Sequence, residues 1–232
     1  MDLSIGSGYG WGMKYRLLIP LACLLASPAL ADDPLQPPAY KECTALAASN
    51  PQQALAKADA WLKVDDGFSA HHCRAMALYG LQQFDKAAAE LMIVRDKVVP
   101  DNIALRTYIA RQGAKAWVNA GRVDQAFALL EKQIHEMSVG KFDNATEAQL
   151  SSGLLLDHAK LRVQYGQAAQ AVQDLDHAIS LTPLDTDVLL ERALAFEQLG
   201  DKSLAKQDAQ SVLRLDPKNG PSADLMRRLR DK

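Results

Sequence analysis

Residues 158–217 decide the fold and read HAKLRVQYGQAAQAVQDLDHAISLTPLDTDVLLERALAFEQLGDKSLAKQDAQSVLRLDP. The stretch holds one pattern twice, and the two copies close with Pro183 and Pro217, which gives a period of about 34 residues. Each copy also carries two alanines at positions i and i+12, Ala159/Ala171 and Ala193/Ala205. This period, with helix-forming residues between turn signals, predicts a unit of two helices joined by a short turn.

The same alanine spacing occurs twice more toward the N-terminus, at Ala75/Ala87 and Ala114/Ala126. Small side chains at matching heights on two antiparallel helices let the backbones approach to about 8 Å. In three units a glycine stands where the first helix must end, and glycine adopts the left-handed C-cap at low cost. These glycines are Gly121, Gly166 and Gly200. An acid then lies near the start of the second helix in two units, at Asp124 and Asp201, where it complements the helix dipole.

This punctuation resembles the tetratricopeptide repeat, a helix–turn–helix unit of about 34 residues, over most of residues 38–230. The resemblance implies an all-α solenoid of about five repeats with a C-terminal capping helix. We expect the units at about 38–66, 68–100, 102–138, 152–185 and 186–219, and the cap over Pro221 to Arg230.

Three places depart from the repeat. The first unit, with helices expected over 40–48 and 51–63, has a turn about three residues short, as in a degenerate N-terminal cap. Residues 139–150 interrupt the period and predict either a longer loop or an extension of a helix. In the second unit, Phe84 stands in the expected turn.

The composition agrees with a soluble helical protein. Hydrophobic residues make up 48% and charged residues 23% of the chain, and runs of alternating β-branched residues, typical of strands, are missing. The net charge of −2 offers no basic excess for a phosphate backbone, so we expect no nucleic-acid partner.

Residues 13–33 have the three parts of a secretory signal. Lys14 and Arg16 precede an apolar stretch, and Ala29-Leu30-Ala31 suits cleavage. The apolar stretch is shorter than the roughly 20 residues that span a bilayer. We therefore expect cleavage after Ala31 and no stable membrane span in the mature protein. An uncleaved N-terminal anchor and lipid attachment at Cys23 are the alternatives.

The chain thus divides into an N-terminal extension and signal peptide over residues 1–31, a linker over 32–37, and a repeat domain over 38–232. Residues 1–12 lack the signal pattern, which leaves open whether translation starts at Met1 or at Met13. The signal predicts a periplasmic or secreted protein of the bacterial envelope.

The mature chain keeps two cysteines, Cys43 and Cys73, in the first helices of neighbouring units. An oxidising compartment and an even number of cysteines favour a disulfide between them. A disulfide needs Cα atoms within about 7 Å, whereas packed helices are commonly about 8–10 Å apart. Two buried free thiols are therefore the alternative.

No catalytic or metal site is indicated. Adjacent residues on a helix point about 100° apart, so the ligand-like trio His71-His72-Cys73 does not converge on one ion. We find no phosphate loop, nucleophile elbow or Cys-x-x-Cys motif. The sequence predicts a protein that is not an enzyme and that binds no cofactor or metal.

Stacked units curve and leave a concave face lined by the first helices. Turning the packing alanines inward directs another set of side chains to that face. The predicted partner-binding residues are Tyr79, Tyr108, Arg111, Lys115, Lys160, Gln164 and Glu197. Basic groups beside tyrosines suit an acidic or carboxylate-bearing peptide, although a solvated charged face without a ligand has the same composition.

We therefore expect a protein-interaction scaffold that binds a peptide or partner protein through the concave face of the stack. The alternative is a non-catalytic structural subunit of a cell-envelope complex that docks through edge or convex contacts. Neither the partner, the pathway nor the oligomeric state follows from the sequence.

Overall fold

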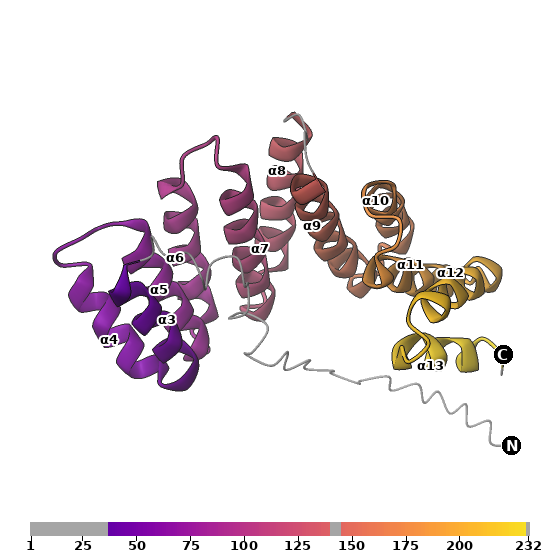
Figure 1. Ribbon diagram of the computed structural model, residues 1–232, viewed down its shortest axis with the longest axis horizontal. Helices are drawn as coiled ribbons and strands as arrows, with labels where there is room; N and C mark the ends of the chain where they lie inside the picture. Colours follow the sequence, from indigo (N-terminus) through magenta and orange to yellow (C-terminus); the bar gives the residue numbers. More distant parts are fainter. Residues whose placement is uncertain (1–36, 140–144, 231–232) are drawn as a thin grey trace, which may run out of the picture.

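The structure is a computed structural model that describes residues 37–139 and 145–230 (Figure 1). Within these residues every regular element is an α-helix. The helices are α3 (Pro38–Ser49), α4 (Pro51–Trp61), α5 (Phe68–Gly80), α6 (Phe84–Lys97), α7 (Ile103–Asn119), α8 (Val123–Val139), α9 (Ala145–Gln164), α10 (Ala168–Leu181), α11 (Thr186–Leu199), α12 (Lys202–Leu215) and α13 (Gly220–Arg228). The predicted signal peptide and nearly all of the linker lie outside the described residues.

Within the described ranges the helices stack as five pairs followed by one single helix. Figure 1 shows the order of the stack. The pairs are α3/α4, α5/α6, α7/α8, α9/α10 and α11/α12, and α13 closes the stack. First helices of neighbouring pairs also touch, α3 with α5, α7 with α9 and α9 with α11. This confirms the predicted all-α solenoid of five repeats with a C-terminal capping helix. Among the described helices, none is both long and apolar enough to cross a membrane.

The paired alanines lie in the core, and none of the eight is more than 4% exposed. Larger side chains fill the space beside them, such as Ile109 and Leu130 in the third unit and Leu175 in the fourth. Because each alanine carries a single methyl group, two helices pack closely at that height while leucines interdigitate above and below. The alanine pattern therefore sets the distance between the helices of each unit.

The turn within each of the second to fifth units has one residue in the left-handed region. Gly121, Gly166 and Gly200 have φ values of 75°, 77° and 82°. Gln82 takes the same place in the second unit, at position i+7 from Ala75, with φ 58°. Phe84 begins α6, so the prediction that it lies in the turn was wrong. The position of this turn could not be recognised in the sequence because its left-handed residue is not a glycine.

Helix α9 begins at Ala145 and is 20 residues long, whereas the other first helices have 12 to 17 residues. Residues 145–150 therefore extend a helix, which was one of the two predicted outcomes for the interrupted region. Residues 140–144 lie outside the described part of the chain.

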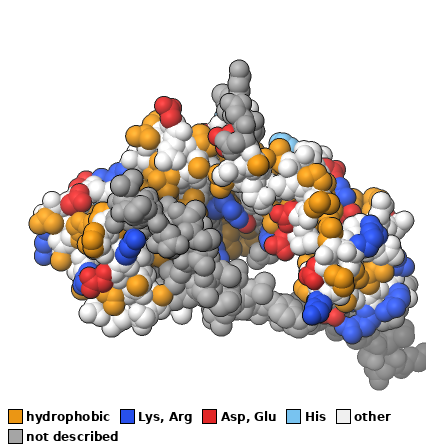
Figure 2. All heavy atoms as spheres, in the orientation of Figure 1, with side chains coloured by type: hydrophobic (Ala, Val, Ile, Leu, Met, Phe, Trp, Pro, Cys, Tyr) orange, Lys and Arg blue, Asp and Glu red, His pale blue; other side chains and the backbone are white. Residues whose placement is uncertain are grey.

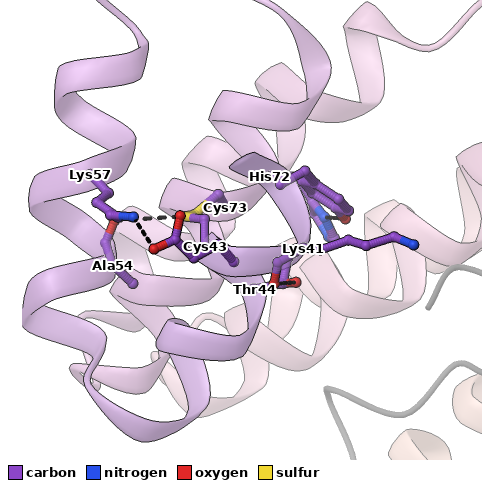
Figure 3. The surroundings of a disulfide bond; sticks show 9 residues. Lys41, Cys43, Thr44, Ala54, Lys57, His72 and Cys73 are labelled. Carbon is purple, nitrogen blue, oxygen red and sulfur yellow. Dashed lines mark hydrogen bonds and ion pairs between the residues drawn. A yellow bond between two sulfur atoms is a disulfide. The ribbon is translucent and has the colours of Figure 1, made fainter. Parts of the chain in front are cut away.

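A disulfide joins Cys43 of α3 to Cys73 of α5, with Cα atoms 6.0 Å apart (Figure 3). Both cysteines lie in the small core of the first unit, together with Ala47, Ala54 and Ala58. That cluster holds no fully buried leucine, isoleucine, valine or phenylalanine, each of which stabilises a core by roughly 1.5–3 kcal/mol. In this unit the disulfide supplies stability that the other units obtain from large buried apolar side chains.

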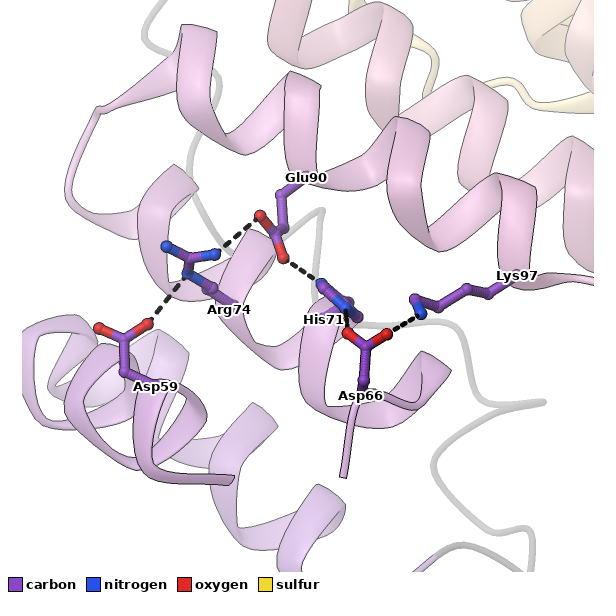
Figure 4. A network of polar contacts seen from close by, with 6 residues as sticks. All are labelled: Asp59, Asp66, His71, Arg74, Glu90 and Lys97. Atoms are coloured by element: carbon purple, nitrogen blue, oxygen red, sulfur yellow. Dashed lines mark hydrogen bonds and ion pairs between the residues drawn. The ribbon is translucent and has the colours of Figure 1, made fainter. Parts of the chain in front are cut away.

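A network of ion pairs ties the second helix of the first unit to the second unit (Figure 4). His71 of α5 contacts the buried Glu90 of α6 through Nδ1, and its Nε2 lies 2.5 Å from Oδ1 of Asp66. Arg74 continues the network, 3.2 Å from Glu90 and 3.0 Å from Asp59 of α4. Lys97 bonds Asp66 at 2.8 Å, and this bond, followed by the one from His71, lowers the pKa of Asp66.

A second polar layer lies between α6, α7 and α8. The buried Arg95 donates to Glu136 at 2.6 Å and to Gln133 at 3.1 Å, and Arg106 also reaches Glu136 at 3.4 Å. Burial favours the neutral form of Glu136, but the two guanidinium groups outweigh it and lower the pKa. Gln133 in turn donates to Thr107. These bonds fix the register between the second and third units.

The left-handed residue at 82 gives a first prediction. Replacing Gln82 with glycine is expected to raise the free energy of unfolding by about 1 kcal/mol, because glycine adopts positive φ without a Cβ clash. Gly166→Ala is expected to lower it by about 1 kcal/mol, since a Cβ there meets no atom within 4 Å and only the backbone conformation opposes it. Urea denaturation followed by circular dichroism measures both. Gln82→Ala is the matched control, and a gain equal to that of Gln82→Gly would contradict the explanation.

The disulfide gives a second prediction. The bond spans 30 residues, so the Cys43→Ser/Cys73→Ser double variant is expected to lose roughly 3–4 kcal/mol of stability in the first unit. Hydrogen exchange of the amides in α3 and α4, compared with those in α11, locates the loss. Digestion without reductant should yield a peptide pair joined through the two cysteines. Recovery of both cysteines as free thiols from oxidised protein would show that the bond does not form.

Candidate functional site

The first helices α5, α7, α9 and α11 carry all seven side chains predicted to bind a partner. Lys160 and Gln164 are exposed, while Tyr108, Arg111, Lys115 and Glu197 are partly buried and Tyr79 is buried. Figure 2 shows a hollow at the middle of the view, bordered by both basic and acidic side chains. The candidate site is the face formed by these first helices.

Arg111 joins α7 to α9. Its Nε donates to Oδ2 of Asp157 at 2.5 Å. Gly153, one turn before Asp157 on α9, leaves room for the guanidinium, because a Cβ there would lie 2.9 Å from Nη1 of Arg111. The sequence analysis assigned Arg111 to the partner-binding face without an internal partner. It did not identify Asp157 as that partner, because the position of Asp157 depends on the interrupted repeat between the third and fourth units. The arginine therefore has a structural role besides any contact with a ligand.

Lys115 and Lys160 are one turn farther along the same two helices. Lys115 follows Arg111 at position i+4, and Lys160 follows Asp157 at position i+3. Among the described residues, neither ammonium group has a hydrogen-bond or ion-pair partner. Glu191 of α11 is near enough to Lys160 to interact electrostatically; burial raises the pKa of Glu191, and Lys160 opposes that rise. The two lysines are thus the cations of this face that remain available.

The N-terminal end of the face is filled by the protein itself. His72 of α5 is 1% exposed. Its Nδ1 lies 2.5 Å from the hydroxyl of Tyr40 on α3, and its Nε2 lies 2.8 Å from Oε1 of Gln112 on α7. The rings of Phe68 and Tyr108 pack around it. Tyr40 and Tyr108 therefore cover the place where a ligand would meet α5.

These bonds fix the state of the buried imidazole. The amide oxygen of Gln112 only accepts, so Nε2 of His72 carries the proton and Nδ1 accepts from Tyr40. Burial lowers the pKa of His72, while the bond to Gln112 opposes that shift. Burial likewise raises the pKa of Tyr40. Burial thus favours the uncharged forms of both His72 and Tyr40, and the hydrogen bonds between these side chains need no charge.

Two other predicted residues have partners within the stack. The hydroxyl of Tyr79 accepts from Nδ2 of Asn119 at 2.5 Å, and its ring packs edge-on against Phe84. Glu197 of α11 accepts two bonds from Arg228 of α13, at 2.7 and 3.0 Å. Tyr79 therefore joins α5 to α7, and Glu197 fastens the capping helix. Neither Asn119 nor Arg228 was marked by the sequence pattern as a partner.

The residues that look like metal ligands point to different places. His71 bonds Asp66 and Glu90, His72 bonds Tyr40 and Gln112, and Cys73 bonds Cys43. This is the divergence that helical geometry predicts for adjacent residues. In the described ranges, no three histidine, cysteine, aspartate or glutamate side chains are grouped so as to hold a metal ion.

No family model matches the chain. A curated relative, the protein PHOX3 of Arabidopsis thaliana, is 26% identical over 117 residues, which are 47% of this chain and 14% of that protein. The chain therefore spans only a small part of the length of this relative.

Solved structures match over much more of the chain. The crystal structure of YrrB, a TPR protein, covers 82% of this chain and 91% of its own, with a TM-score of 0.59 and 11% identity. The structure of MamA (AMB-1) covers 78% of this chain and 99% of its own, with a TM-score of 0.57 and 16% identity. Identities this low reveal the fold rather than the function. The chain therefore has the fold of tetratricopeptide-repeat proteins.

Proposed function

We propose that this protein is a scaffold of the bacterial cell envelope that binds a peptide or partner protein along the concave face of its stack. The observation that carries the proposal is the pair of cations Lys115 and Lys160 on the neighbouring helices α7 and α9, for which the described residues supply no hydrogen bond or ion pair. Most arginines of the fold are engaged in structural ion pairs, including Arg74, Arg95 and Arg192. Two lysines left available on one face favour an acidic partner.

A fixed scaffold supports this role. The Arg111–Asp157 pair holds α7 against α9, so the two lysines are presented by helices whose relative position is set. A site on rigid elements loses less conformational entropy when it binds. YrrB, which has the same fold, is described as carrying an unusual peptide-binding site. Binding by a stack of this kind requires no catalytic group, and we propose none.

The location in the periplasm or outside the cell rests on two features. The signal-like segment of residues 13–31 predicts export. The Cys43–Cys73 disulfide suits an oxidising compartment, because cytosolic reductants keep most thiols reduced.

A second candidate is a structural subunit of an envelope complex that docks through an edge of the stack. It is favoured by large apolar side chains exposed in the turns between units. Val64, Val99 and Leu184 are 84%, 65% and 74% exposed. These turns belong to the edge rather than to the concave face, so variants of the two surfaces separate the two functions.

The concave-face function predicts the behaviour of charge-reversed protein. Lys115→Glu/Lys160→Glu is expected to weaken capture of the partner from envelope extract at least tenfold, because two attractive charges become repulsive. Lys132→Glu, an exposed lysine on the second helix α8, is the matched control and should bind like wild type. Thermal melting of each variant shows that the stack remains folded. Unchanged capture by the double variant, with loss in a Val64→Ser/Val99→Ser variant, would favour the edge-docking function instead.

The envelope location gives its own prediction. Protein secreted from a bacterial host is expected to begin at Asp32, because the signal peptide is removed after Ala31. Intact mass spectrometry of the mature protein measures this end. A mass that retains residues 13–31 would indicate the uncleaved anchor, and a lipid-modified Cys23 would indicate attachment to a membrane.

A further inference from the structure

Charge is unevenly divided between the last two helices and the rest of the stack. Residues 202–230, which contain α12 and α13, carry seven basic and three acidic residues, a net charge of +4. The other described residues, 37–139 and 145–201, carry 15 basic and 20 acidic residues, a net charge of −5. Figure 2 shows basic side chains gathered at the C-terminal end of the stack, where Figure 1 places α13. One end of an otherwise acidic molecule is therefore positive.

The packing of α13 brings basic residues of two helices to one corner of the stack. Arg228 donates to Glu197 of α11 at 2.7 and 3.0 Å, so the end of α13 lies beside the turn between α11 and α12. Leu229 belongs to the same buried cluster as Ala205 of α12. The neighbours of these residues in the sequence therefore meet at one place. We call it the basic corner, and its residues are Lys202, Lys206, Arg227, Arg228 and Arg230.

Three cations of the basic corner are available to a ligand. Lys202 and Arg230 are exposed and Lys206 is partly exposed, and the described residues supply no hydrogen bond or ion pair for any of them. The two other arginines of the corner form ion pairs with acids of α11 and α13. Asp201, in the adjoining turn, is exposed and caps α12 by accepting from the amide of Leu204 at 3.2 Å. The three available cations therefore lie near one exposed carboxylate.

The composition of the basic corner favours a lipid surface over a protein. Leu199 ends α11 beside the corner and is 50% exposed. An exposed leucine among basic residues is typical of segments that lie at a membrane surface, where the leucine enters the headgroup region and the cations contact lipid phosphates. Interfaces between proteins are poor in lysine and depend on buried aromatic anchors, whereas the five residues of the corner include two lysines and no aromatic residue.

Beyond the proposed function, we propose that the basic corner binds a bilayer that contains anionic phospholipids. The lipid phosphates accept hydrogen bonds from Lys202, Lys206 and Arg230, and Leu199 enters the headgroup region. The rest of the stack, with its net negative charge, is repelled by the same surface. The molecule therefore stands on its C-terminal end, with the units before α11 directed away from the membrane.

Binding of the secreted mature protein to lipid vesicles tests the proposal. Residues 1–31 are left out because their apolar segment would bind vesicles by itself. Each lysine or arginine near an anionic surface strengthens binding about fivefold, so vesicles with about one-third phosphatidylglycerol should bind about twentyfold more tightly than phosphatidylcholine alone. Cosedimentation measures both affinities. Sodium chloride at about 1 M should remove the difference, because it shortens the Debye length to about 3 Å.

The Lys202→Gln/Lys206→Gln/Arg230→Gln variant is expected to bind the anionic vesicles at least tenfold more weakly than wild type, because it loses the three available cations. The matched control changes the net charge equally by removing three exposed lysines of the other units, and it should bind as wild type does. Its substitutions are Lys41→Gln, Lys63→Gln and Lys132→Gln. Thermal melting of both variants shows that the stack remains folded.

Asp201→Asn gives a test in the opposite direction. Asparagine keeps the side-chain oxygen that caps α12 but removes a negative charge, so binding to the anionic vesicles should tighten about fivefold. Equal or absent binding to the two kinds of vesicle, or equal loss in the triple variant and its control, would overturn the proposal. Binding of soluble polyglutamate through the basic corner, without binding to vesicles, would overturn it in favour of an acidic protein. Because no variant here changes Lys115 or Lys160, the concave-face function stands or fails separately.

Discussion

The close contact between two helices at a pair of alanines is the constraint on which the rest of the structure depends. A larger side chain at either place would push the helices apart and misalign the leucines that interdigitate on both sides. The contact recurs in four units, and clusters of buried apolar side chains follow one another along the stack. The face formed by the first helices, with Lys115 on α7 and Lys160 on α9, is a product of that repeated distance.

Sequence reasoning predicted what local patterns determine. The alanine spacing gave the helix pairs, glycine gave three of the turns, and the polar-backed final segment gave the capping helix α13. It placed Phe84 wrongly because Gln82 adopts a left-handed conformation without the residue type that signals one. A left-handed turn residue is readily recognised in a sequence when it is glycine, and Gln82 gives no such signal.

The details of the site depend on contacts between distant segments, and these were harder to predict. Arg111 meets Asp157 only because the stack continues across the interrupted period, and Glu197 meets Arg228 only because α13 folds back on α11. Neither pair has a characteristic spacing in the sequence. His72 is buried because Tyr40 of the atypical first unit covers it, a contact that the repeat pattern does not reveal. Periodicity predicted which face a side chain lies on, and it left open which partner that side chain meets.

Fraying of a helical stack begins at its ends, where a unit has a neighbour on one side only. The bridge between Cys43 and Cys73 joins α3 directly to α5, so the N-terminal end cannot peel away without disturbing an interior helix. At the opposite end, α13 is held only by noncovalent contacts, chiefly the buried Leu225 and the Arg228–Glu197 pair. The two ends of the solenoid therefore differ in how they open. Local unfolding of the C-terminal end involves no covalent cross-link, whereas the N-terminal end is held by the disulfide.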